Sequence, residues 1–192
     1  FFDNGLSIAP AYGSGDRSTG GDYLSKEDFI EILKYAKERH ITVVPELESP
    51  GHGRAAIKAM EARYTYYMQQ GNKEEAERYL LHDLDDKSVY NSAQNWTDNV
   101  MNPALPSVYS FVEKVIDEFA AMYHEAGLKL EKVSLGGDEV PNGVWEKSPK
   151  IQALMRREKM KSVHEVWPYY VNKLNEICIA KGLKMAGWEE FG

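Results

Sequence analysis

The sequence lacks several features that mark common classes of protein. It contains a single cysteine, so no internal disulfide framework can hold it together. Its apolar runs are far too short to cross a bilayer. It also has no excess of basic residues, because the formal net charge is −7. An acidic chain without a basic patch is not expected to bind nucleic acid or an anionic membrane surface.

Signatures of nucleotide and metal sites are also missing. There is no Gly-x-Gly-x-x-Gly and no Walker-type loop, which weakens a nucleotide-binding interpretation. The five histidines form neither a His-x-His nor a His-Glu-x-x-His pair. A metal-dependent hydrolase with Glu46, Glu48 and His52 as ligands is therefore only a minor alternative. Cys178 lies in a predicted helix and is interpreted as a small core residue rather than a nucleophile.

What the sequence does contain is an alternation of helical and strand-like patterns. With 192 residues and 43% hydrophobic content, the chain can bury one sizeable core. Short β-branched or apolar runs predict three buried strands, and apolar residues at helical spacing predict helices between them. Such alternation is typical of parallel βαβ units. The strands are expected at 41–44, 132–135 and 183–187, and the helices at 25–39, from Gly53 onward, at 73–81, from Pro106 to Gly127, at 148–159 and at 162–180.

Local signals set several of these boundaries. Ser25 with Asp28, and Ser162 with Glu165, are typical of capping boxes that begin helices. Residues 1–22 are rich in glycine, serine and aspartate and predict a long loop. Residues 70–104 are polar and irregular apart from one short helix, which is long for a connection and predicts an insertion near a working face.

Each of the three predicted strands is followed at its C-terminal end by polar or aromatic residues. A (β/α)₈ TIM barrel builds its active site from those positions. Three strands cannot close such a barrel, which usually needs about 250 residues. The sequence also begins and ends abruptly beside its own core elements. We therefore expect residues 1–192 to be one α/β domain that is a segment of a barrel, excised from a larger protein. The strand-end residues are Glu46 and Glu48, then Asp138 and Glu139, then Trp188 and Glu189.

The stretch Val133–Val140 contains the main candidates for catalytic residues. It is interpreted as a buried strand that leads through Gly136 and Gly137 into the adjacent carboxylates of Asp138 and Glu139. A carboxylate pair at a strand end can perform acid–base work, because each charge makes ionisation of the other more costly. Taken alone, the same octapeptide fits an ordinary strand exit with two solvated acids equally well.

Three motifs together resemble the family 20 glycoside hydrolases. They are Val44–His52 with its Pro-Glu-Leu-Glu-Ser-Pro-Gly-His run, Leu135–Val140 with Gly-Gly-Asp-Glu, and Ala186–Glu190 with Gly-Trp-Glu-Glu. Their order and spacing match from about Tyr23 to the end of the chain. The resemblance implies a β-N-acetylhexosaminidase with a (β/α)₈ catalytic barrel, of which these would be strands three to five. It implies no cofactor and no metal.

The resemblance also implies a mechanism in which the substrate assists, an exception to the usual two-carboxylate scheme. Glu139 would be the general acid, and Asp138 would orient the substrate's 2-acetamido group, whose carbonyl oxygen is the nucleophile. His52 would support the acid, and Trp188 would form an aromatic wall around the acetamide. Glu46 and Glu189 would support the site from behind or lie in loops, and Trp145 would pack a lid or anchor the next helix.

The resemblance implies terminal β-linked N-acetylglucosamine or N-acetylgalactosamine as substrate and a secreted, periplasmic or cell-surface location. The family's sugar-gripping arginine and later pocket residues have no counterpart in this chain. The competing interpretation is therefore an inactive barrel fragment or a carbohydrate-binding remnant. Because a partial barrel leaves strand edges unpaired, we expect the chain to self-associate.

Overall fold

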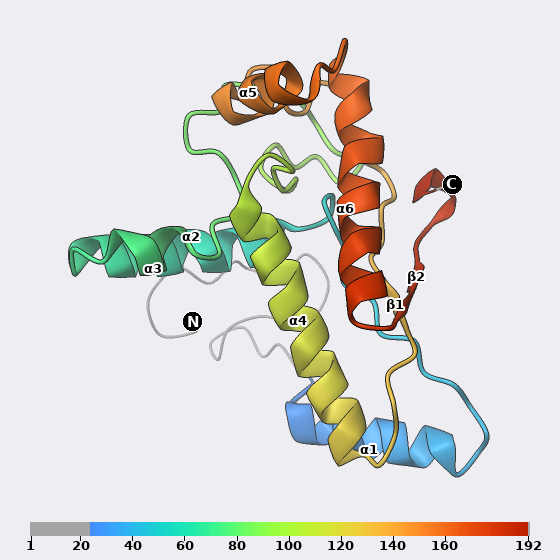
Figure 1. Cartoon of the computed structure of the whole chain (residues 1–192). Coiled ribbons are helices and arrows are strands. Elements are labelled where there is room, and N and C mark those ends of the chain that lie inside the picture. Colours follow the sequence, from blue (N-terminus) through green and yellow to red (C-terminus); the bar gives the residue numbers. More distant parts are fainter. Residues whose placement is uncertain (1–23, 192) are drawn as a thin grey trace.

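The computed structural model describes residues 24–191, so the loop predicted at 1–22 lies outside the described part of the chain. Within that part, no helix is long and apolar enough to cross a membrane. Figure 1 shows the described elements in chain order: α1 (Lys26–Lys37), α2 (Arg54–Gln69), α3 (Lys73–Glu77), α4 (Pro106–Glu125), β1 (Lys132–Ser134), α5 (Pro149–Glu158), the 3-10 helix η1 (Val163–Glu165), α6 (Val166–Ala180), β2 (Lys184–Ala186) and the 3-10 helix η2 (Glu189–Phe191).

Most helix boundaries follow the local signals. The Ser25 hydroxyl accepts a hydrogen bond from the Asp28 amide at 3.0 Å, and the Asp28 carboxylate accepts one from the Ser25 amide at 2.9 Å. This is the capping box predicted for α1. Pro106 is the first residue of α4, and Gly127, with φ of +68°, follows the Ala126 cap at its end. These positions confirm the predicted start of α1 and the predicted limits of α4, whereas α1 ends at Lys37, two residues before the predicted end.

The capping box predicted at Ser162 is wrong. The Ser162 side chain makes no capping hydrogen bond, and Glu165 instead accepts one from the Lys161 amide at 2.9 Å. A 3-10 turn, η1, precedes α6, which begins only at Val166. Pro168 occupies the third position of α6, where the missing N–H costs no helical hydrogen bond. The predicted helix of 162–180 is therefore two elements.

The described sheet is parallel and is centred on β1. Val133 pairs with Met185 of β2, and on the other side an isolated parallel bridge joins Ser134 to Glu46. The Leu47 amide donates to the Ser134 carbonyl at 2.9 Å, and the Ser134 amide donates to the Pro45 carbonyl at 2.9 Å. The strand predicted at 41–44 is thus wrong in position, because the segment that pairs with β1 is Pro45–Leu47.

Residues 41–44 have a different environment from the one predicted. The Ile41 amide donates to the Ala36 carbonyl and so closes the end of α1 instead of pairing with β1. The side chain of Ile41 is 59% exposed and that of Val44 is 40% exposed. The β-branched run therefore lacks the burial on both faces that its composition predicts, and pairing begins only at Pro45.

The main core lies between β1 and the helices α1, α4 and α6. Figure 1 shows α4 and α6 beside each other, with α1 across the foot of α4 and the strands beyond α6. Cys178 is fully buried on α6, as predicted for a core residue. This packing fixes β1, and with it the residues that follow β1. The fully buried members of the cluster include Val108, Val112, Ile116, Val133, Leu135, Tyr170, Leu174 and Cys178.

Candidate active site

The chain leaves β1 through a backbone that only glycine fits. Gly136 has φ of +71°, and a Cβ built there would lie 2.2 Å from the Oε2 atom of Glu48. A side chain at this position would therefore meet both an unfavourable backbone conformation and a steric clash. Three residues later Glu139 also adopts a positive φ of +51°. The predicted bend is present, and it includes Glu139 as well as the two glycines.

This bend brings Asp138 and Glu139 to one histidine. The Nε2 atom of His52 lies 3.3 Å from Asp138 Oδ2 and 3.5 Å from Glu139 Oε2. Adjacent side chains on a regular strand point to opposite faces, so both acids can meet His52 only because the strand has ended. The structure therefore brings together three of the predicted site residues.

The Pro-Gly-His loop is held by hydrogen bonds to the residue that follows β1 and to the segment before α4. The Ser49 hydroxyl donates to the Leu135 carbonyl at 3.0 Å, and the Met101 amide donates to the Pro50 carbonyl at 2.7 Å. A Cβ on Gly51 would lie only 3.2 Å from the Asp138 carbonyl oxygen. This close approach holds His52 over the acid pair.

Glu48, which the sequence interpretation placed at a strand end and weighed as an alternative metal ligand, lies next to the acid pair. Burial raises the pKa of its carboxyl to about 8, and the neighbouring carboxyls of Glu46 and Asp138 act in the same direction. Glu48 Oε2 and Asp138 Oδ1 are both buried without a hydrogen-bond partner in the described structure. A proton on Glu48 supplies the donor that two adjacent carboxylates would otherwise lack.

A usable signal for Glu48 was present in the sequence. Glu46 and Glu48 are two residues apart beside a strand, so their side chains share one face of the chain. Glu46 accepts a hydrogen bond from the Ser134 hydroxyl at 2.5 Å and is thereby bound to β1. This contact places Glu46 against the strand rather than on the acid pair.

The aromatic candidates occupy different environments. The Trp188 amide donates to the Gly136 carbonyl at 2.9 Å, and its side chain is 55% exposed, as is expected of a residue that could meet a ligand. Glu189 follows it in η2 and is exposed.

Trp145 is buried and donates its indole N–H to the Met101 carbonyl at 3.0 Å, so it anchors its loop. A pocket of about 550 Å³ lies beside Glu139 and is lined in part by Trp145 and Trp167.

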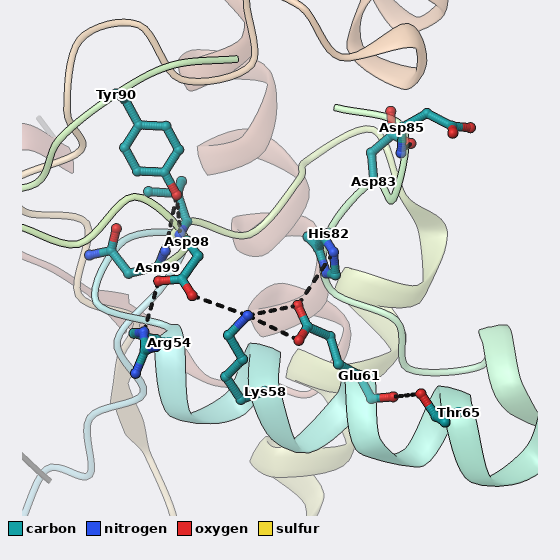
Figure 2. A network of polar contacts seen from close by, with 11 residues as sticks. Arg54, Lys58, Glu61, Thr65, His82, Asp83, Asp85, Tyr90, Asp98 and Asn99 are labelled. Atoms are coloured by element: carbon teal, nitrogen blue, oxygen red, sulfur yellow. Dashed lines mark hydrogen bonds and ion pairs between the residues drawn. The ribbon is translucent and has the colours of Figure 1, made fainter. Parts of the chain in front are cut away.

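A polar network ties the irregular segment before α4 to α2. Figure 2 shows Asp98 between two cations of α2, at 2.7 Å from Arg54 Nε and 3.1 Å from Lys58 Nζ. The Tyr90 hydroxyl accepts hydrogen bonds from the amides of Asn99 at 3.0 Å and Val100 at 3.2 Å. The segment is thus firmly held, and Gln94 within it donates to Glu139 Oε2 at 2.8 Å. No sequence motif singled out Gln94.

The ligand set predicted for the metal alternative does not assemble. Within residues 24–191, the group of three histidine, cysteine or acidic side chains close enough to share an ion is His52, Asp138 and Glu139, with ligand atoms within 4.8 Å of one another. Glu46 and Glu48 are not part of it. The residues that could hold a cation are therefore those of the acid pair itself.

The chain matches one protein family along nearly its full length. The family model described as "Glycosyl hydrolase family 20, catalytic domain" matches residues 6–192. The β-hexosaminidase of Vibrio vulnificus is 38% identical over 187 residues, covering 95% of this chain and 22% of that protein. The N,N'-diacetylchitobiase of Vibrio harveyi is 45% identical over 138 residues, covering 70% of this chain and 16% of that protein.

A solved structure gives the same result. The crystal structure of a GH20 exo-β-N-acetylglucosaminidase from Vibrio harveyi, in complex with N-acetylglucosamine, aligns with a TM-score of 0.73 and 35% identity. The alignment covers 88% of this chain and 23% of that one. This chain spans less than a quarter of the length of each of these three relatives.

Proposed function

The chain belongs to glycosyl hydrolase family 20, and we propose that it forms part of the catalytic barrel of a β-N-acetylhexosaminidase. The single observation that carries this proposal is the convergence of His52, Asp138 and Glu139 where two parallel segments end. In a TIM barrel such strand ends form the active site. Because the relatives are much longer, we propose that the chain belongs to a longer protein in which Pro45–Leu47, β1 and β2 are the third, fourth and fifth barrel strands.

The proposed reaction releases a terminal, non-reducing N-acetylhexosamine in two steps. In the first step, Glu139 gives its proton to the glycosidic oxygen as the anomeric carbon–oxygen bond breaks. The carbonyl oxygen of the substrate's own acetamido group bonds to the anomeric carbon and closes an oxazolinium ring. In the second step, Glu139 takes a proton from water, whose oxygen attacks the anomeric carbon and reopens the ring with net retention.

The neighbouring residues support this division of roles. Asp138 would accept a hydrogen bond from the acetamide N–H and stabilise the positive charge that develops on the ring. His52 lies within 3.5 Å of both acids and would orient them. The exposed ring of Trp188 offers an apolar face that suits a sugar or an acetamide methyl group. The protonated Glu48 would remove one negative charge from beside Asp138.

A second candidate is an isolated domain that binds carbohydrate but does not hydrolyse it. The observation that favours it is the small described sheet, in which β1 pairs with β2 and with one isolated bridge. An open sheet of this kind leaves the site without the walls that a closed barrel supplies. The two candidates differ in whether the full-length protein that contains these 192 residues hydrolyses the substrate that it binds.

The test is hydrolysis of 4-nitrophenyl N-acetyl-β-glucosaminide and of N,N'-diacetylchitobiose by the full-length protein. Glu139→Gln should lower kcat on the disaccharide by roughly 10²- to 10⁴-fold, the usual contribution of a general acid. Glu113→Gln, the same change on the exposed face of α4, serves as the control. Activity of Glu139→Gln equal to the wild type, or failure of a thiazoline analogue of N-acetylglucosamine to inhibit, would refute the mechanism.

A further inference from the structure

The turn that carries Gln94 is rigidly built. The Ser92 amide donates to the Trp96 carbonyl at 2.8 Å, and the Ser92 hydroxyl accepts from the Trp96 amide at 3.0 Å. Between them Asn95 adopts a positive φ of +63°. The indole ring of Trp96 lies under the Arg54 guanidinium, 4.1 Å from it, and Arg54 is paired with Asp98. The C-terminal side of the turn is therefore attached to α2, because Trp96 and Asp98 both contact Arg54. Figure 2 shows the Arg54–Asp98 pair.

Because the turn is held in this way, the side-chain amide of Gln94 lies next to the carboxyl of Glu139. Gln94 Nε2 donates to Glu139 Oε2 at 2.8 Å across 45 positions of sequence. Glu139 Oε2 can accept this hydrogen bond from the Gln94 N–H both when the carboxyl is ionised and when its proton is on Oε1. The same Oε2 atom lies 3.5 Å from His52 Nε2. One oxygen of Glu139 is thus surrounded by nitrogen atoms from two different segments.

We propose that Gln94 is a positioning residue that fixes the Glu139 carboxyl and determines which of its oxygens delivers the proton. The inference rests on the proposed function, in which Glu139 is the general acid. With Oε2 held as an acceptor by Gln94, the proton resides on Oε1. It passes from Oε1 to the glycosidic oxygen as the bond to the anomeric carbon breaks, and the bonding electrons remain on the leaving oxygen. Water returns a proton to Oε1 in the second step, so Gln94 is unchanged over the cycle.

The inference predicts dependence on the leaving group. A sugar alcohol leaves poorly without a proton, whereas 4-nitrophenolate is stable as an anion and needs little help from the acid. A loss of acid positioning therefore slows the disaccharide and largely spares the aryl substrate. A merely structural role of Gln94 would slow both substrates alike.

The experiment compares Gln94→Ala with the wild type in the full-length protein on both substrates. We expect kcat on N,N'-diacetylchitobiose to fall roughly ten- to a hundredfold, as expected when a hydrogen bond to a charged group is lost. On 4-nitrophenyl N-acetyl-β-glucosaminide kcat should fall by less than about threefold, because that leaving group needs little proton transfer. Gln94→Glu should be worse than Gln94→Ala on the disaccharide, since it replaces a donor by a like charge.

A control variant in the same turn distinguishes the loss of the contact with Glu139 from a disturbance of the turn itself. Asn91 donates to Asn95 rather than to Glu139, so Asn91→Ala removes an amide without touching the acid. It should leave the ratio of the two kcat values at the wild-type level. Equal losses on both substrates for Gln94→Ala, or no loss, would overturn the inference. A wild-type protein inactive on both substrates would instead refute the proposed function.

Discussion

At the scale of single residues, the environment of Glu48 is the most unusual in the site. Its carboxyl lies against the backbone of Gly136, near the carboxyls of Glu46 and Asp138. Burial and these neighbours keep it protonated well above the usual range for a glutamate. Because the folded chain holds this proton more tightly than the unfolded chain, the free energy of unfolding depends on pH through Glu48. This dependence can be measured without substrate.

We expect Glu48 to make the folded chain less stable as the pH rises from about 4.5 to about 8. In this range the unfolded chain has released the proton and the folded chain still holds it, so the folded state binds more protons and loses stability with rising pH. Glu48→Gln, which has no proton to release, should make that loss shallower. Urea midpoints measured across this range provide the comparison, with Glu113→Gln as the control. An unchanged pH slope would contradict the raised pKa of Glu48.

Asp138 should matter for the acetamide rather than for proton transfer. Asp138→Asn keeps the shape of the side chain but removes the charge that we propose stabilises the oxazolinium ring, so kcat should fall by roughly 10²-fold on both substrates. The relevant measurement is kcat on the aryl and disaccharide substrates of the full-length protein. Asp117→Asn, the same change at an exposed residue of α4, should leave kcat unchanged. A loss confined to the disaccharide would instead assign Asp138 to proton transfer.

At the scale of elements, the site depends on how β1 ends. β1 is held between Pro45–Leu47 and β2, and the buried faces of α4 and α6 cover it. The bend at Gly136 then moves the chain away from the sheet, so that Asp138 and Glu139 both reach His52. The position of the acids therefore follows from the bend more than from the strand.

Gly136→Ala should destabilise the fold and separate the acids from His52. A methyl group there would meet Glu48 Oε2 at 2.2 Å in addition to the cost of a positive φ, together about 2 kcal/mol or more. Gly71 is a matched control, because it has the same φ of +71° and nothing within 4 Å of a built Cβ. Urea unfolding should show a larger loss for Gly136→Ala than for Gly71→Ala. Equal losses would mean that Glu48 moves aside without cost.

At the scale of the whole molecule, the described sheet is open. β2 pairs with β1 on one side, and Pro45–Leu47 pairs with β1 on the opposite side. No further strand is present among residues 24–191. Ile41 and Val44 expose apolar surface beside that second edge. Unpaired edges next to apolar surface favour association between chains.

We expect the 192-residue chain to self-associate and to lack the activity of the full-length protein. Size-exclusion chromatography with light scattering measures the first property, and 4-nitrophenyl N-acetyl-β-glucosaminide measures the second. Ile41→Lys places a charge at the exposed edge and should shift the chain toward the monomer, whereas Ile32→Lys on the exposed side of α1 should not. A monomeric chain that cleaves the aryl substrate would contradict both expectations.

Much of the fold could be predicted because its signals are local. The Ser25 capping box, Pro106 at the start of α4 and Gly127 at its end each depend on contacts within one turn of chain. The position of the first paired segment was missed, since the run 41–44 has a strand-like composition but pairing with β1 begins only at Pro45. Composition indicates a preference for strand, whereas pairing is decided by the neighbouring segment.

The same distinction holds for the site. The sequence by itself determined the family motifs and with them Asp138, Glu139, His52 and Trp188 as candidates. Only the tertiary structure placed Glu48 beside Gly136 and Gln94 on Glu139. These contacts join segments tens of residues apart, and the spacing of Glu46 and Glu48 marks Glu48 as a candidate without indicating which residue it contacts. The sequence determines which side chains are present. Packing of the core decides which of them lie close enough to change each other's pKa or orientation.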